Sequence, residues 1–161
     1  KVSPAALAAL AYPAKPLARL WKEQVGAMAD PQGRQTAYAE LSALEGELQT
    51  PSEEWATFRG AKVFLPAVRE LSAVDPLALA GGLRVPCLFA YPERGLVIQA
   101  FHSDVLAPSL HAGQEVRTLA GVGHYLTAQE TEGGGGGVVD AKACGEVAEW
   151  LKKAMAPASA P

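Results

Sequence analysis

The apolar run from Leu83 to Tyr91 constrains the fold of this chain more than any other segment. It reads Leu-Arg-Val-Pro-Cys-Leu-Phe-Ala-Tyr and is bounded by Gly81-Gly82 and by Pro92. A run this short and this apolar is typical of a strand buried on both faces, as strands are in a parallel sheet. We expect Pro86 at its first residue, where no ladder hydrogen bond is lost.

A second strand is predicted over Gln114 to Ala120, where polar and apolar residues alternate. A short helix over residues 104–110, interrupted by Pro108 and ended by Gly113, would connect the two strands. Strand, helix and strand in this order predict a βαβ unit within residues 83–120 and an α/β fold with a parallel sheet.

Residues 1–74 show the spacing of helices separated by proline. Ser3-Pro4 begins the first helix, which ends near Tyr12, and Asp30 to Gly33 forms a turn. Thr50-Pro51-Ser52-Glu53 is a capping box that predicts a helix carrying Trp55 and Phe58. The remaining helices are expected over residues 16–28, 37–48 and 65–71.

Asp140 is predicted to cap a last helix, with Val147, Trp150 and Leu151 facing inward. The glycine-rich segment 131–137 before it is predicted to be a flexible loop. The expected organisation is a helical, cap-like lobe over 1–74, an α/β segment over 75–156 and a tail over 157–161.

Composition excludes several functional classes. With 14 basic and 17 acidic residues, a net charge of -3 and no basic block, the chain is not expected to bind nucleic acid. Its apolar runs are too short for a membrane span. Two cysteines, Cys87 and Cys144, do not suggest a disulfide framework, so we expect an intracellular, reducing compartment. Since the first residue is Lys, upstream sequence is expected to be missing.

His124 is the candidate catalytic residue. It follows the second strand in the sequence Leu-Ala-Gly-Val-Gly-His, where Gly121 and Gly123 allow a sharp turn. Many hydrolases present their catalytic base on such a strand and loop, but a histidine that only completes a turn is an equal alternative. His102 and His111 lie nine residues apart, which is no metal-ligand spacing, so structural roles are expected for both and no metal site is predicted.

From about Asp75 onward, the order of parts resembles the C-terminal half of the α/β-hydrolase family. In that fold a helix and a Leu-x-x-Ile-x-Val-Pro segment lead into a buried strand, and a helix and another strand lead to a Gly-x-Gly-His loop and a final helix. The matching segments are Leu79 to Tyr91, Gly121 to His124 and Val139 to Ala154. The resemblance implies that residues 1–74 are the inserted cap and that His124 is the general base.

Two departures bear on this implied activity. No Gly-x-Ser-x-Gly nucleophile elbow occurs in the chain, nor a Cys or Asp variant of it. In addition, Gly95 stands where the family carries its orienting Asp, in a Gly-Glu-x-Asp loop after the buried strand. Glu93, two residues earlier, is expected to be an exposed loop charge, with the role of orienting acid as the alternative.

The sequence therefore agrees with two alternative functions. The first is hydrolysis of an ester, amide or epoxide with His124 as general base, a nucleophile from outside this chain and no cofactor. The second is an inactive, hydrolase-like scaffold or interaction subunit. In both, a missing N-terminal half or a partner protein is expected to complete the sheet. Four aromatic side chains are expected to pack in the core, or alternatively to line a pocket for an apolar small-molecule substrate: Trp21, Tyr38, Trp55 and Phe58.

Overall fold

The computed structural model describes residues 4–94, 102–124, 126–127 and 138–156. Its contacts divide the chain into two units: a sheet unit, residues 1–14 and 77–161, and an inserted unit, residues 15–76. The glycine-rich segment 131–137, Gly95 and the tail 157–161 lie outside the described residues.

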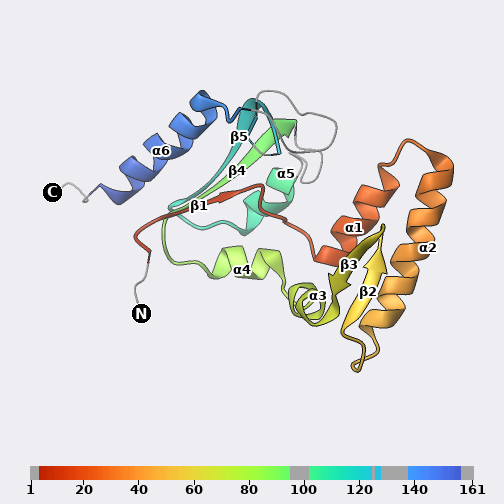
Figure 1. Cartoon of the computed structure of the whole chain (residues 1–161). Helices are drawn as coiled ribbons and strands as arrows, with labels where there is room; N and C mark the ends of the chain where they lie inside the picture. The colour runs from red at the N-terminus through yellow and green to blue at the C-terminus, as the bar shows by residue number, and fades with distance from the viewer. Residues whose placement is uncertain (1–3, 95–101, 125, 128–137, 157–161) are drawn as a thin grey trace. The chain divides into compact units, whose positions relative to one another are not determined.

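The sheet unit contains a three-stranded sheet in the order β1-β4-β5 (Figure 1). Its strands are β1 (Leu7–Leu10), β4 (Cys87–Arg94) and β5 (Gln114–Gly123), and β4 pairs parallel with both neighbours. Between β4 and β5 lie α5 (His102–Leu106) and the 3₁₀ turn η1 (Ala107–Ser109), which contains Pro108. The predicted α/β class and the parallel βαβ unit are thereby confirmed.

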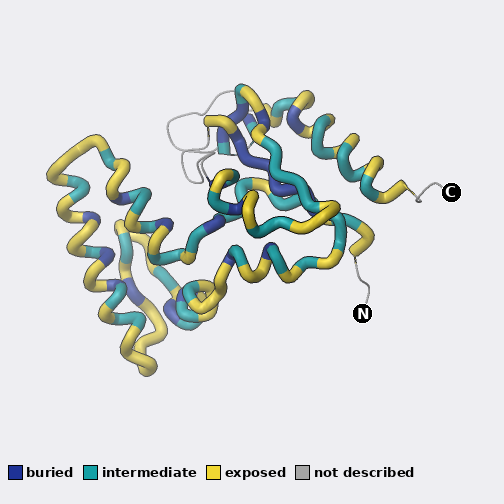
Figure 2. Tube along the Cα trace, turned by 180° about the vertical axis from the view of Figure 1, so that it is seen from behind, coloured by how far each residue is buried: buried dark blue, intermediate teal, exposed yellow. Residues whose placement is uncertain are grey.

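Strand β4 is the most buried part of the chain, as Figure 2 shows, with Cys87 to Tyr91 all 0% exposed. It begins at Cys87, one residue after the Pro86 that was expected to be its first residue, and it continues through Pro92 to Arg94. Leu7 N–H donates to Pro86 C=O and Ala11 N–H to Ala90 C=O, so the even-numbered residues of β4 direct their backbone groups toward β1. Pro92 lies beyond the last residue of β1, so its missing N–H costs no ladder bond.

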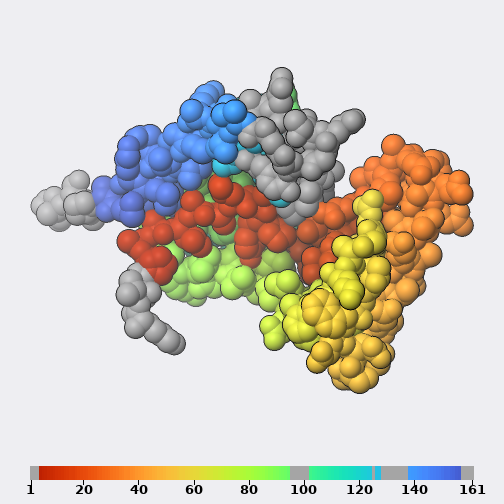
Figure 3. All heavy atoms as spheres, in the orientation of Figure 1, coloured from red at the N-terminus to blue at the C-terminus, as the bar shows by residue number. Residues whose placement is uncertain are grey.

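The first predicted helix is wrong: Leu7–Leu10 is the parallel edge strand β1, aligned with Cys87 to Ala90 of β4. The leucines three residues apart suggested a helical face, but a four-residue strand is too short to show its period of two. Pairing with the buried β4 decides the conformation instead. Figure 3 shows this N-terminal segment at the surface of the sheet unit, where Leu7 and Leu10 are exposed.

Two helices accompany the sheet, α4 (Pro76–Gly82) before β4 and α6 (Ala141–Met155) after β5. Helix α6 begins as predicted, because the Asp140 side chain accepts a hydrogen bond from Ala143 N–H at 2.8 Å. Helix α6 contacts all three strands. Its Ala143, Val147 and Trp150 pack with a core of four further buried residues: Leu88, Ala90, Leu119 and Val122.

The inserted unit contains α1 (Leu17–Gly26), α2 (Pro31–Leu48), the hairpin β2 (Trp55–Phe58) and β3 (Ala61–Phe64), and α3 (Leu65–Ser72). The helix predicted for residues 50–58 is wrong. Arg59 and Gly60 both have positive φ, 51° and 75°, as a tight two-residue hairpin turn requires, and two aromatic and β-branched segments flank them. The segment from Thr50 to Glu53 is a turn in which Glu53 N–H donates to Thr50 C=O, not a helix start.

Helix α2 starts earlier than predicted, because Pro31 to Gly33 form its first turn. The Asp30 carboxylate caps this turn by accepting from Gln32 and Gly33 N–H, at 3.2 and 2.8 Å. Pro31 at the first helical position loses no hydrogen bond, so the apparent chain break is a helix start. The buried side chains of the inserted unit then form two clusters around Leu41 and Leu44 of α2.

Among the described residues, no helix combines the length and the apolar character that crossing a membrane would require.

Candidate functional site

The carboxyl ends of β4 and β5 lie side by side and carry the candidate site. Parallel pairing brings Arg94, the last residue of β4, opposite Gly123, the last residue of β5. His124 follows Gly123 directly and is partly buried. In open parallel sheets this is the edge at which functional side chains gather.

A bulge lies between this edge and the regular part of the ladder. Pro92 pairs with Leu119 and Arg94 with Gly123, so the single residue Glu93 stands against three residues of β5. Gly121, in the middle of the three, has φ of +75°. The Glu93 carboxylate accepts a hydrogen bond from Gly121 N–H at 2.7 Å and thus supplies the partner that the interrupted ladder does not.

The His124 loop is closed by backbone hydrogen bonds on both sides. Leu126 N–H donates to Gly123 C=O and Gly123 N–H donates to Thr127 C=O, both at 2.9 Å. Asp140 N–H donates to Leu126 C=O at 2.7 Å, which ties the loop to the residue that caps α6. These bonds anchor the described residues on both sides of His124 at the carboxyl end of β5.

The loop after β4 was expected to supply no orienting acid, with Glu93 as the alternative. Glu93 is exposed, as predicted, but its carboxylate holds the Gly121 N–H instead of lying free. The sequence from Gly95 to Phe101 contains no acidic residue, and neither does the segment Ala11 to Ala14 after β1.

The other two histidines have structural contacts. His102, at the start of α5, is 1% exposed, and its Nδ1 accepts a hydrogen bond from Ala14 N–H at 3.2 Å. His111 is exposed and its Nε2 contacts the carbonyl of Gly81. Within the described ranges, no group of three or more His, Cys, Asp and Glu side chains is arranged to hold a metal ion.

The face of β4 away from α6 carries two buried ionisable side chains, Cys87 and Tyr91, and burial favours the neutral form of both. Burial raises the pKa of the Cys87 thiol, which donates to Val85 C=O at 3.3 Å. Burial and the neighbouring Tyr12 raise the pKa of the Tyr91 phenol, and its hydroxyl has no hydrogen-bond partner among the described residues. Phe89 packs edge-on against Tyr12, with ring centroids 5.2 Å apart. This face is therefore a packed core and supplies no ionised nucleophile.

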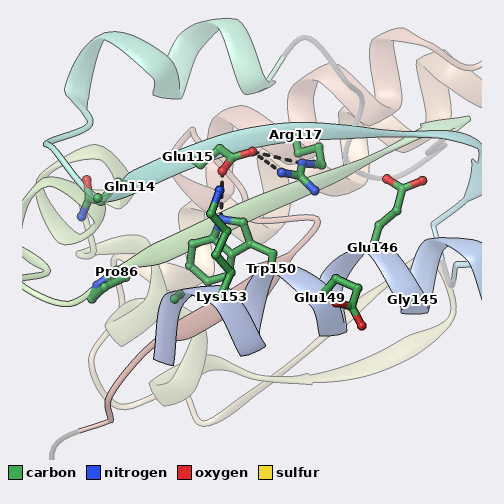
Figure 4. Close-up of a pocket in the computed structure, with 11 residues that line it drawn as sticks. Pro86, Gln114, Glu115, Arg117, Gly145, Glu146, Glu149, Trp150 and Lys153 are labelled. Atoms are coloured by element: carbon green, nitrogen blue, oxygen red, sulfur yellow. Dashed lines mark hydrogen bonds and ion pairs between the residues drawn. The ribbon is translucent and has the colours of Figure 1, made fainter. Parts of the chain in front are cut away.

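A groove between β5 and α6 was not predicted from the sequence (Figure 4). Glu115 accepts hydrogen bonds from Trp150 Nε1, at 2.8 Å, and from Arg117 Nε, at 3.1 Å. The Arg117 hydrogen bond, with help from Trp150 and the charges of Arg117 and Lys153, holds the pKa of Glu115 below its ordinary value against the opposing effect of partial burial. The available signal was the alternation of β5, which places Glu115 and Arg117 on the side that α6 covers.

The four aromatic residues expected from the sequence to share a core or a pocket do not share one environment. Trp21 packs on Phe58 with ring centroids 5.5 Å apart, in keeping with core packing. Trp55 is 56% exposed and lies against Phe64 on the hairpin, and Tyr38 is exposed on α2. Trp55 and Phe58 were predicted to lie on a helix, but both lie on strand β2.

No protein-family model and no curated protein sequence matches this chain, so the α/β-hydrolase resemblance remains a prediction.

Proposed function

We propose that this chain is the carboxyl-terminal part of an α/β-hydrolase-like enzyme in which His124 is the general base. The substrate class is an ester, amide or epoxide. The nucleophile comes from outside this chain, and so does the carboxylate that orients the imidazole. A partner or a further segment of polypeptide completes the sheet beside β1.

The position of His124 carries this proposal. It stands at the carboxyl end of a parallel strand pair, on a turn fixed by the bonds of Gly123 and Leu126. A general base must be held within hydrogen-bond reach of the proton that it removes, and the backbone hydrogen bonds of Gly123 and Leu126 on either side of His124 contribute to such positioning. The insertion of residues 15–76 between β1 and β4 agrees with the place of a cap before the buried strand.

In this function the imidazole takes the proton of the nucleophile or of a water molecule as the new bond to the substrate forms, and it returns that proton to the leaving group. Glu93 contributes by position, because its bond to Gly121 N–H sets the path of β5 three residues before His124.

An inactive scaffold is the second candidate, and one observation favours it. The segments 11–14 and 95–101, which follow β1 and β4, contain no acidic residue, and the carboxylate of Glu93, near the end of β4, already accepts a backbone N–H. Removal of the orienting acid lowers turnover by a factor of about 10⁴ in the serine-protease case, so the absence of an acid from these two segments favours a scaffold.

The test compares His124→Ala with His111→Gln in the natural polypeptide that contains these residues, using a panel of short-chain esters, amides and epoxides. We expect His124→Ala to lower kcat/KM by about 10²- to 10⁴-fold. His111→Gln, at an exposed histidine of the same unit, should leave kcat/KM unchanged. An unmodified protein that hydrolyses none of the panel would favour the scaffold.

A further inference from the structure

The outer edge of β5 has backbone hydrogen-bonding groups that no described residue pairs with. Cys87 N–H donates to Gly113 C=O at 3.1 Å, and in a parallel ladder this direction alternates along the strand. Val116 and Thr118 therefore direct their N–H and C=O groups away from β4. Among the described residues, no strand pairs with this edge of β5. An edge of this kind is a template for another strand.

Two side chains of opposite charge flank Val116 on β5. Glu115 precedes it, Arg117 follows it, and both side chains lie on the side of the sheet that α6 covers (Figure 4). If a second β5 lies antiparallel with the two Val116 residues opposite each other, Glu115 of each copy faces Arg117 of the other. Opposite charges directly across two strands stabilise their pairing.

We propose that this edge pairs with the same edge of a second copy of the chain, around a two-fold axis at Val116. The two Val116 residues exchange both of their backbone hydrogen bonds. Thr118 N–H donates to Gln114 C=O of the other copy, once in each direction. Gln114 N–H does not join this ladder, because it already donates to His111 C=O at 3.0 Å.

The groove beside β5 fits the same arrangement. Its α6 wall carries Glu146 and Glu149 toward the start of the helix and Lys153 toward the end, with Trp150 between them. A two-fold axis perpendicular to the sheet runs the two α6 helices antiparallel across the joined strands. The acidic end of each groove then faces the lysine end of the other, and the open side of Trp150 is covered.

A second copy is favoured over a foreign strand because a two-fold interface requires a self-complementary surface. Both charge patterns, on β5 and on α6, complement themselves when they are reversed. A strand from another protein would need only the free edge and would leave this symmetry without a role.

The test is the sedimentation equilibrium of the full chain and of three variants. Arg117→Glu places like charges across the axis and should raise the dimer dissociation constant by about tenfold or more. Adding Glu115→Arg to Arg117→Glu restores opposite charges and should recover most of the affinity. Val116→Pro removes an outward N–H and no bond to β4, and it should give a monomer.

The matched control is Ala8→Pro, which removes an outward N–H from the other edge strand, β1, and should leave the dimer intact. Circular dichroism and thermal unfolding identify any variant that is misfolded, and the charge reversal is informative even if Val116→Pro does not fold. The proposal is wrong if the unmodified chain is a monomer at about 100 µM, if the double charge reversal fails to recover a folded dimer, or if only Ala8→Pro dissociates it.

Discussion

The Glu93 carboxylate accepts the backbone N–H of Gly121 at 2.7 Å and so joins the end of β4 to the bulge of β5. The residue that sequence position suggested as an alternative acid thus fixes the strand that leads to His124. Its negative charge and its acceptor oxygen are separable properties, and each can be removed by itself.

Glu93→Ala removes the acceptor, whereas Glu93→Gln keeps an oxygen in place and removes only the charge. We expect Glu93→Ala to lower the free energy of unfolding by about 0.5–1.5 kcal/mol, and Glu93→Gln to lower it less. Urea unfolding of both variants measures this difference. Hydrolysis, where it is present, should follow the same order.

A different result would assign Glu93 the chemical role. If Glu93→Gln keeps the stability of the unmodified protein but abolishes hydrolysis as fully as His124→Ala, the charge itself is required. Glu93 would then be the orienting acid, and its place beside Gly121 would be secondary.

Gly121→Ala tests the bulge. Apart from its two chain neighbours, no described residue has an atom within 4 Å of the position that a Cβ would take, so the cost comes from the backbone, whose φ is +75°. A side chain in this left-handed conformation costs about 1–2 kcal/mol. Gly121→Asn should cost less, because Asn tolerates this conformation. Gly145→Ala, in α6 of the same unit, also meets open space and should stabilise by about 0.5–1 kcal/mol. Equal losses of unfolding free energy in Gly121→Ala and Gly121→Asn would contradict a conformational cause.

The parts predicted correctly from the sequence are those in which local pattern and burial agree. The segment from Cys87 to Tyr91, which forms the first part of β4, has no charged side chain to expose, so a buried central strand suits it. The cap of α6 was equally predictable, because Asp140 makes a local hydrogen bond that needs no distant residue.

The errors occur where distant pairing decides the structure. Nothing local makes Leu7–Leu10 a strand, since its partner β4 lies about eighty residues further along the chain. The hairpin at Trp55–Phe64 does have a local signal, Arg59-Gly60, but the Thr50-Pro51-Ser52-Glu53 pattern is also typical of a helix start and predicts the opposite structure.

Only the local part of the candidate site could be predicted from the sequence. The glycines around His124 predict a turn at this position. The bulge of three β5 residues and the hydrogen bond of Glu93 depend on the register between β4 and β5, and the sequence of one strand does not determine that register. The groove at Trp150 likewise depends on where α6 crosses the sheet.

Arg69 on α3 should be essential to the inserted unit. Its guanidinium donates to four carbonyls, of Leu48 and Glu47 at the end of α2 and of Thr50 and Glu53 in the following turn, at 2.6 to 3.2 Å. Arg69→Ala leaves these carbonyls without their charged donor and should cost about 1.5–3 kcal/mol. Arg69→Lys should restore only part of the lost free energy of unfolding, because an ammonium group cannot donate in the planar, multidentate geometry of a guanidinium. Chemical unfolding followed by tryptophan fluorescence measures both, and full rescue by lysine would show that charge alone matters.

The pH dependence of stability should report the Glu115 contacts. The Arg117 hydrogen bond holds the pKa of Glu115 below the ordinary value of 4.5, and Trp150 acts in the same direction. A carboxyl group whose pKa is lowered by folding stabilises the folded state above its ordinary pKa, and this stabilisation is lost as the pH falls through the lowered pKa. Glu115→Gln should therefore be less stable than the unmodified chain at neutral pH, and the difference should shrink as the pH falls below 4.5.

Trp150→Phe removes one hydrogen-bond donor to Glu115 and should move the pKa of Glu115 back toward its ordinary value. Carboxyl NMR at one protein concentration measures this pKa. A difference between the unmodified chain and Glu115→Gln that stays constant down to the lowest pH at which both are folded would contradict this account.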